Sequence, residues 1–216
     1  MKERPILFSW PMVRATLEGR KTQTRQVIDP RGWKPGKFGW NGDVHDFSML
    51  NSSLYGHPGD RLWVREGWRF VDCEFDGARW SAQYDYRAGY NTSLNARHFF
   101  EGTDPYIKLG WRSCIHMPRE ASRISLEITS VRVERLQSIF WFDALNEGVV
   151  EVMGDRDNTN PTCRGYVGRE DGLKFGIRAT PRDAYHDLWD SINAKRGLGW
   201  DANPWVWVVD FKMVTA

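Results

Sequence analysis

One amphipathic segment near the C-terminal end limits the folds that are available to this chain. Residues 180–197 (TPRDAYHDLWDSINAKRG) predict a helix that Thr180 caps, Pro181 begins and Gly197 ends. Its apolar side chains recur at helical spacing and form one stripe, made of Ala184, Tyr185, Leu188, Trp189 and Ile192. Residues 205–214 (WVWVVDFKMV) follow as an apolar strand. A helix with one apolar face beside such a strand predicts a domain that mixes helices with a sheet.

Shorter patterns along the rest of the chain predict more strands than helices. The expected strands are residues 5–9, 25–28, 58–70, 79–87, 124–128 and 131–133, and the expected short helices are residues 10–19 and 141–149. The alternation of the last two strands slips at Ser130, which indicates a bulge or bend. We therefore expect one α+β domain over residues 1–216, with loop insertions near residues 29–59 and 72–112.

Composition narrows the classes of function. The 216 residues are 41% hydrophobic and carry a net charge of only +2, which argues against the broad basic face that binds long duplexes. No apolar run reaches the roughly 18–20 residues that cross a bilayer, and the apolar stretch in MKERPILFSW is too short for a signal peptide. The sequence thus predicts a protein of the cytoplasm without a membrane partner.

Metal binding is not expected either. The three cysteines, Cys73, Cys114 and Cys163, are widely spaced, and the five histidines show no ligand spacing such as H-x-x-x-H. We expect neither a metal nor a cofactor.

A short segment rich in charged and polar side chains, GRKTQTRQV (residues 19–27), comes directly after the first expected helix. A buried lysine can act as a base, and a threonine hydroxyl becomes a nucleophile when a neighbouring base takes its proton. Lys21 and Thr24 therefore form a minimal apparatus for acyl transfer if both side chains reach one pocket. The alternative is a solvated or phosphate-contacting loop, in which Thr24 is present only because threonine favours β-strands.

Several blocks of the chain, in order, resemble the ASCH superfamily, whose domains have a PUA-like mixed β-barrel fold with flanking helices. The blocks are GRKTQTRQV, GDRLWVREGW, SRISLEITSVRVERL, DALNEGV and WVWVVDFKMV, and together they span about half of the chain. The longer form, with IHMPREASRI and NPWVWV, looks like the phage and prophage branch.

This resemblance implies a function as well as a fold. Small bacterial members that hydrolyse N(4)-acetylcytidine use a lysine, a threonine and a glutamate, which match Lys21, Thr24 and Glu147 here. The usual signature has glutamate where this chain has Thr24, a difference that marks the hydrolase-like subset. The implied activity is an amidohydrolase acting on N(4)-acylated cytidine or a related cytosine derivative. The alternatives are a non-catalytic RNA-binding module and an RNA-cleaving nuclease, with an RNA fragment as the partner.

Two acidic residues compete for the catalytic carboxylate. Glu147 lies near a helix end beside Gly148, where it can also be an ordinary surface residue. Glu66 falls on the apolar face of its expected strand, where an unpaired charge is costly. It is expected to help in the site or to form a buried ion pair with Arg25, which is itself a candidate substrate-binding residue.

The remaining candidates would bind the base. Trp63 and Trp68 can stack on a pyrimidine, as aromatic side chains do with unpaired bases, although most tryptophans pack within a hydrophobic core. His116, from the IHMPR segment, can form a hydrogen bond with the edge of the pyrimidine. Arg119 can contact a phosphate or remain a surface charge. The sequence therefore places Trp63, Glu66, Trp68, His116 and Arg119 in the substrate-binding set.

Overall fold

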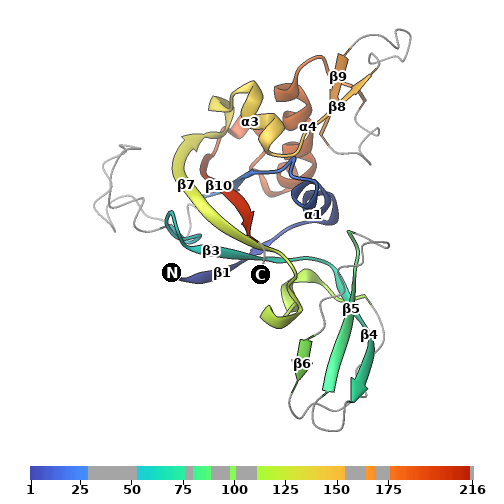
Figure 1. Ribbon diagram of the computed structural model, residues 1–216. Helices are drawn as coiled ribbons and strands as arrows, with labels where there is room; N and C mark the ends of the chain where they lie inside the picture. The colour runs from blue at the N-terminus through green and yellow to red at the C-terminus, as the bar shows by residue number, and fades with distance from the viewer. Residues whose placement is uncertain are drawn as a thin grey trace.

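The computed structural model describes residues 1–28, 53–75, 80–88, 98–100, 111–153, 164–168 and 176–214. Its elements are β1 (Glu3–Leu7), α1 (Trp10–Leu17), β2 (Gln23–Val27), β3 (Arg61–Arg65), β4 (Trp68–Phe75), β5 (Trp80–Tyr86), β6 (His98–Phe100), β7 (Ser125–Arg135), α3 (Trp141–Asn146), β8 (Val150–Met153), β9 (Arg164–Val167), α4 (Pro181–Asn193) and β10 (Trp205–Val214). In Figure 1, α3 and α4 lie at one end of the molecule and the strands β4, β5 and β6 at the other. The mixture of helices and sheets confirms the α+β prediction.

The central sheet has five strands in the order β1-β3-β7-β10-β2. The β1–β3 pair is parallel, and the other neighbours are antiparallel. Among the described strands β1 and β2 are the two edges, so this sheet is open, whereas the resemblance implies a closed barrel. The β7–β10 register shifts where Asp210 faces Ser130 and Phe211 faces Ile128, which confirms the bulge expected near Ser130.

Strand β10 lies between two cores. Val206 and Val208 belong to the apolar cluster that α3 and α4 cover. Trp207, Val209 and Phe211 belong to a second cluster, with residues of β1, β3 and β7. Successive side chains of a strand point to opposite faces, so this nearly continuous apolar run fills both sides of the sheet.

Helix α4 confirms the expected boundaries. The Thr180 hydroxyl accepts a hydrogen bond from the backbone N–H of Asp183 at 3.1 Å, and Gly197 has the left-handed φ of 73° that suits the end of a helical segment. One member of the predicted stripe was wrong, because Ile192 remains 43% exposed.

The strand expected over residues 58–70 is divided into two. β3 ends at Arg65, and β4 begins at Trp68 and joins a separate three-stranded sheet. Glu66 therefore lies in the connection and not within a strand.

The strand predicted over residues 79–87 is confirmed as β5, which pairs with β4 and β6. Most of the insertion expected at residues 29–59, and residues 76–79, 89–97 and 101–110 of the other, lie outside the described residues.

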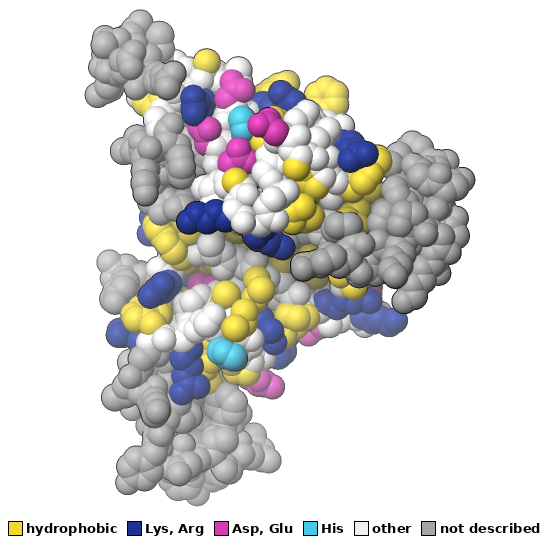
Figure 2. Space-filling view, turned by 180° about the vertical axis from the view of Figure 1, so that it is seen from behind, with side chains coloured by type: hydrophobic (Ala, Val, Ile, Leu, Met, Phe, Trp, Pro, Cys, Tyr) yellow, Lys and Arg dark blue, Asp and Glu magenta, His cyan; other side chains and the backbone are white. Residues whose placement is uncertain are grey.

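Charge is spread rather than gathered on one face of the molecule. On the face shown in Figure 2, the Lys and Arg side chains form separate groups with acidic side chains among them. This pattern agrees with the low net charge of the sequence and does not form one continuous basic surface.

Candidate functional site

A tight turn between α1 and β2 brings Lys21 into the interior. The backbone N–H groups of Arg20 and Lys21 donate to the Ala15 carbonyl oxygen at 2.9 and 3.0 Å. Gly19 has a φ of 73°, a left-handed conformation that glycine adopts without steric cost. The chain therefore reverses directly after the helix, and Lys21 is only 1% exposed.

The end of α3 docks against this turn. The backbone N–H of Thr22 donates to the Asn146 carbonyl oxygen at 2.9 Å. Glu147 is the C-cap residue of α3, and Gly148 follows with a φ of 100°. A Cβ atom at Gly148 would lie 3.1 Å from the Ala15 Cβ, so glycine permits the close approach of the two segments. Glu147 is thereby carried into the interior and is 5% exposed.

The Lys21 ammonium group has three acceptors for its three protons. Nζ donates to Glu147 Oε2 at 2.7 Å, to the Glu147 carbonyl oxygen at 3.0 Å and to the Gln23 carbonyl oxygen at 2.8 Å. Burial lowers the pKa of Lys21 from its usual value of 10.5, the charge and hydrogen bond of Glu147 oppose that shift, and the nearby Arg25 charge adds to it. The amine is thus well held, and its burial makes loss of a proton easier than for a lysine in water.

Arg25 ties the same carboxylate to further acidic groups. Its Nη1 donates to Glu147 Oε1 at 3.3 Å, and its Nη2 donates to Asp143 Oδ2 at 3.2 Å and to Glu134 Oε2 at 3.3 Å. Nη1 also donates to the Gln23 side-chain oxygen. Since Arg25 is 4% exposed and bound by three carboxylates, its guanidinium group has little freedom to move.

Tyr185 of α4 completes the surroundings of Glu147. Burial raises the pKa of the Tyr185 hydroxyl well above 10, and the charge and hydrogen bond of Glu147 add to this shift, while the Arg25 charge opposes it. The phenol therefore stays protonated and lines the same pocket as Glu147. Sequence reasoning counted Tyr185 only as a core residue of the helical stripe.

A pocket of about 260 Å³ opens beside this cluster. Its lining includes Thr24, Arg25, Glu147 and Tyr185, with Leu188 and Trp189 of α4 among the apolar walls. Thr24 is 1% exposed, and no hydrogen bond engages its hydroxyl within the described part of the chain. Lys21 lies behind the lining, where Nζ bonds the carbonyl of the peptide group that joins Gln23 to Thr24.

The structure thus brings together Lys21, Thr24, Arg25 and Glu147 and adds Asp143, which sequence reasoning missed. A signal for Asp143 exists, because it lies four residues before Glu147 and such positions share one face of a helix. Gln23 and Glu134 carried no comparable signal, since their contacts join segments more than 100 residues apart.

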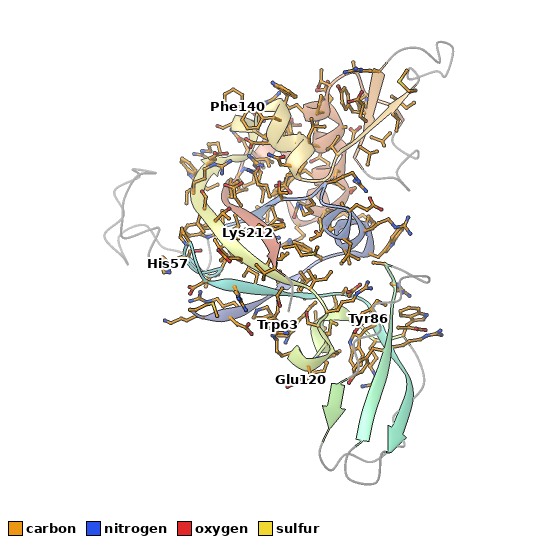
Figure 3. All side chains as sticks on the ribbon, in the orientation of Figure 1. His57, Trp63, Tyr86, Glu120, Phe140 and Lys212 are labelled. Atoms are coloured by element: carbon orange, nitrogen blue, oxygen red, sulfur yellow. The ribbon has the colours of Figure 1, made fainter. Side chains whose placement is uncertain are left out.

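The other five predicted residues lie elsewhere, and none of them is in the lining of this pocket. Trp63 lies on β3 under the guanidinium groups of Arg65 and Arg119, at 4.6 and 5.9 Å from the ring centre. In Figure 3 it lies well away from Phe140, which directly precedes α3, and on the side of Tyr86 and Glu120. Arg119 forms an ion pair with Glu3 at 2.9 Å, and His116 is exposed.

Glu66 and Trp68 belong to a separate buried region. Glu66 is 1% exposed, as expected, but it pairs with Arg123 and not with Arg25, through contacts of 2.9 and 3.1 Å. Trp68 is buried edge-on against Tyr84, with ring centres 5.5 Å apart. The expected pair with Arg25 was wrong because Arg25 lies on β2 at the opposite edge of the central sheet from β1 and β3.

Among the described residues, no group of three or more His, Cys, Asp or Glu is arranged to hold a metal ion. None of the helices in this part of the chain has the length and apolar character to span a bilayer. No family model matches the sequence, and no significant match was found among curated proteins or solved structures. The function must therefore be inferred from the site itself.

Proposed function

We propose that the chain is a PUA-like ASCH domain that hydrolyses the amide of N(4)-acylated cytosine nucleosides. The observation that carries this proposal is the contact of 2.7 Å between Lys21 Nζ and Glu147 Oε2, buried beside a pocket that Thr24 and Glu147 both line. A buried amine, an acceptor for its proton and a hydroxyl nucleophile are the parts that acyl transfer requires.

The chemistry begins from the form of the protein in which Lys21 has given its proton to solvent and the amine is neutral. Burial favours this form, and the Glu147 carboxylate holds the amine in place. The free amine then takes the hydroxyl proton of Thr24 while Oγ1 attacks the acyl carbonyl carbon. The bond between this carbon and N4 breaks, and the Lys21 ammonium group returns a proton to the leaving cytosine amine.

Water completes the cycle by hydrolysing the ester that joins Thr24 to the acyl group. Lys21 takes a proton from the attacking water and passes it to the departing Thr24 oxygen, so that the acid is released, the Thr24 hydroxyl is restored and the amine is again neutral. A second route has water, activated by Lys21, attacking the amide directly. Mass spectrometry of protein quenched in acid during turnover distinguishes the two, since only the first route adds an acyl group to Thr24.

The size of the pocket favours a small substrate. Small-molecule pockets typically hold about 300–1,000 Å³, so a volume of about 260 Å³ suits one compact ligand rather than a duplex. Leu188 and Trp189 provide an apolar wall against which a base ring can pack, with polar groups at the Thr24 end.

The charges around the pocket argue against an RNA-cleaving nuclease. The basic side chains of the cluster are Lys21, Arg25 and Arg132, and the acidic ones are Glu147, Asp143, Glu134 and Asp210. When all are ionised, this cluster carries one more negative than positive charge, and Arg196, which also lines the pocket, brings the sum to zero. Lys21, Arg25 and Arg132 are already paired with carboxylates, so none of these three is a ready partner for a phosphate group.

The test is incubation of the purified protein with N(4)-acetylcytidine and, separately, with labelled RNA. We expect chromatography to show release of cytidine and acetate in equal amounts and no shortening of the RNA. Cleaved RNA together with intact acetylcytidine would contradict this proposal and indicate a nuclease. RNA that is bound but remains whole, with intact acetylcytidine, would indicate an RNA-binding module.

A further inference from the structure

One face of α4 runs along the pocket that Thr24 lines. The lining residues from this helix and the turn after it recur every three or four positions: Tyr185, Leu188, Trp189, Ile192, Asn193 and Arg196. Glu147 and Leu188 line both this pocket and a smaller neighbouring one, so the reacting groups lie at the Leu188 end of the face. Arg196 lies about two turns further on, roughly 12 Å along the helix axis.

Arg196 is the one charged residue of the lining that has no charged partner among the described residues. Arg25 and Glu147, the other two charged residues of the lining, pair with each other at 3.3 Å. Within the described part of the chain, the guanidinium group of Arg196 makes one hydrogen bond, from Nη1 to Asn193 Oδ1 at 3.3 Å. Its Nε and Nη2 therefore remain available, and together they can donate to two oxygens of one phosphate group.

The end of α4 holds this guanidinium group at the pocket. Asn193 is 5% exposed, accepts from Arg196 through its side-chain oxygen, and donates through Nδ2 to the Trp189 carbonyl oxygen at 3.3 Å. Trp189 Nε1 in turn donates to the Leu198 carbonyl oxygen at 2.8 Å, and Gly197 ends the segment with a φ of 73°. A buried amide thus ties an exposed arginine to the wall of the pocket.

The wall between the two ends of the pocket suits the remainder of a cytosine nucleotide. Positions N1 and N4 lie on opposite sides of the cytosine ring, so a substrate whose acyl group reaches Thr24 directs its ribose away from Thr24. Leu188 and Trp189 offer apolar surface to the ring, and Ile192 follows on the same face of α4. A phosphate group on the ribose then comes toward Arg196.

We propose that Arg196 binds a phosphate group on the ribose of the substrate, so that the enzyme prefers phosphates of N(4)-acylcytidine to the free nucleoside. This inference rests on the proposed function and names its substrate class. Thr24 and Glu147 act on the amide at one end of the pocket, and Arg196 holds the phosphate at the other. Because the phosphate lies away from the reacting groups, it is bound and not cleaved.

The first test compares kcat/KM for N(4)-acetylcytidine, its 5′-monophosphate and its 3′-monophosphate. We expect at least one of the two phosphates to raise kcat/KM about tenfold or more over the nucleoside, the gain of a charge-assisted hydrogen bond. A gain with the 5′-phosphate indicates a free nucleotide as the substrate, and a gain with the 3′-phosphate indicates a residue of an RNA fragment. Equal values for all three compounds would overturn the proposal.

Substitution of Arg196 tests whether this residue causes the preference. In Arg196→Gln, the ratio of kcat/KM between phosphate and nucleoside should fall close to one. Arg196→Lys keeps the charge but loses the paired donors, and should retain part of the ratio. Lys195→Gln is the matched control, because it removes the same charge from the exposed neighbouring residue, which is not in the lining. This control should keep the whole ratio, and an equal loss in both Gln variants would contradict a specific site.

Binding of the products separates failure of this inference from failure of the proposed function. Isothermal titration calorimetry compares the cytidine monophosphates with cytidine and needs no turnover. We expect the preferred phosphate to bind about tenfold more tightly than cytidine to the unsubstituted protein and to Lys195→Gln, and no more tightly to Arg196→Gln.

Each proposal can then fail alone. If acetylcytidine and both of its phosphates remain intact, the proposed function is wrong, and calorimetry still decides whether Arg196 binds a phosphate. If the compounds are hydrolysed but neither kcat/KM nor binding depends on Arg196, the phosphate site is wrong and the proposed function stands.

Discussion

Two buried ion pairs in this molecule look alike and differ in what they can do. Lys21 with Glu147 and Arg123 with Glu66 both join a basic and an acidic side chain at 2.9 Å or less, and all four side chains are at most 5% exposed. The first pair lies beside a pocket that Thr24 lines. The second is covered by the Tyr86 ring, whose centre lies 4.2 Å from the Arg123 guanidinium carbon.

On the proposed mechanism, burial of charge alone does not make a reactive site. A lysine amine can lose its proton when burial lowers its pKa, whereas a guanidinium group keeps its proton under all ordinary conditions. The Lys21 pair also has a neighbouring hydroxyl and room for a ligand. We therefore expect Lys21 and Glu147 to act in chemistry, and Arg123 and Glu66 to contribute only to stability.

The largest effect is expected at Thr24, the proposed nucleophile beside the first pair. Thr24→Ala should lower the turnover of N(4)-acetylcytidine at least about a thousandfold, since a unit of nucleophile and base fails when one member is lost. Thr24→Ser keeps the hydroxyl and should retain turnover within about tenfold. Steady-state kinetics checks both, with circular dichroism to confirm folding. Equal turnover by the Ala and Ser variants would show that the hydroxyl takes no part.

A smaller effect separates the two glutamates. Glu147→Gln should lower turnover about a hundredfold, because the neutral amide holds and orients the Lys21 amine less well than the carboxylate does. Glu66→Gln should change turnover less than about threefold. It should instead lower the free energy of unfolding in urea, since Arg123 loses its buried counter-charge. The reverse order of the two rates, in folded proteins, would move the catalytic carboxylate to Glu66.

The pH dependence of the rate should report the amine. Below the lowered pKa of Lys21, the rate should rise about tenfold for each pH unit, because only the neutral amine can take the Thr24 proton. The same rise should persist in Arg123→Lys, whose substitution lies in the other pair. A rate that is independent of pH below the usual value of 10.5 would exclude Lys21 as the base.

The smallest effect is on stability, where the two pairs should respond to pH with opposite signs. Burial lowers the Lys21 pKa. The contribution of Lys21 to the free energy of unfolding is therefore present above the usual value of 10.5 and is lost as pH falls through the folded-state pKa. Burial raises the Glu66 pKa above its usual value of 4.5. The contribution of Glu66 to the free energy of unfolding is therefore present below pH 4.5 and is lost as pH rises through the folded-state pKa.

Each unit of pKa shift changes the free energy of unfolding by about 1.4 kcal/mol. Urea unfolding across pH, compared with Lys21→Met and with Glu66→Gln, measures these two slopes separately. Slopes of the same sign would remove the electrostatic contrast between the pairs.

Local patterns in the sequence predicted much of the fold. The apolar run of β10, the cap at Thr180 and the slip near Ser130 depend on neighbours in the chain, and all three were confirmed. Closure of a barrel is a long-range property, and the described strands form an open sheet instead.

The candidate site was predictable only in part, for a related reason. Alternation indicated that Glu66 points inward, but it carried no information on which cation would meet it across the fold. The partners of Arg25 are 109, 118 and 122 residues away along the chain. Lys21 and Glu147 were selected through a family resemblance, and no spacing between them would have paired them.

The measurement that tests the central claim most directly is the hydrolysis of N(4)-acetylcytidine by Lys21→Arg beside Arg123→Lys. Both substitutions keep a positive charge opposite a buried glutamate, but only Lys21→Arg removes an amine that can give up its proton. We predict a loss of at least about a hundredfold in Lys21→Arg and nearly full activity in Arg123→Lys, with both proteins folded by circular dichroism. An active Lys21→Arg protein would contradict the assignment of Lys21 as the base.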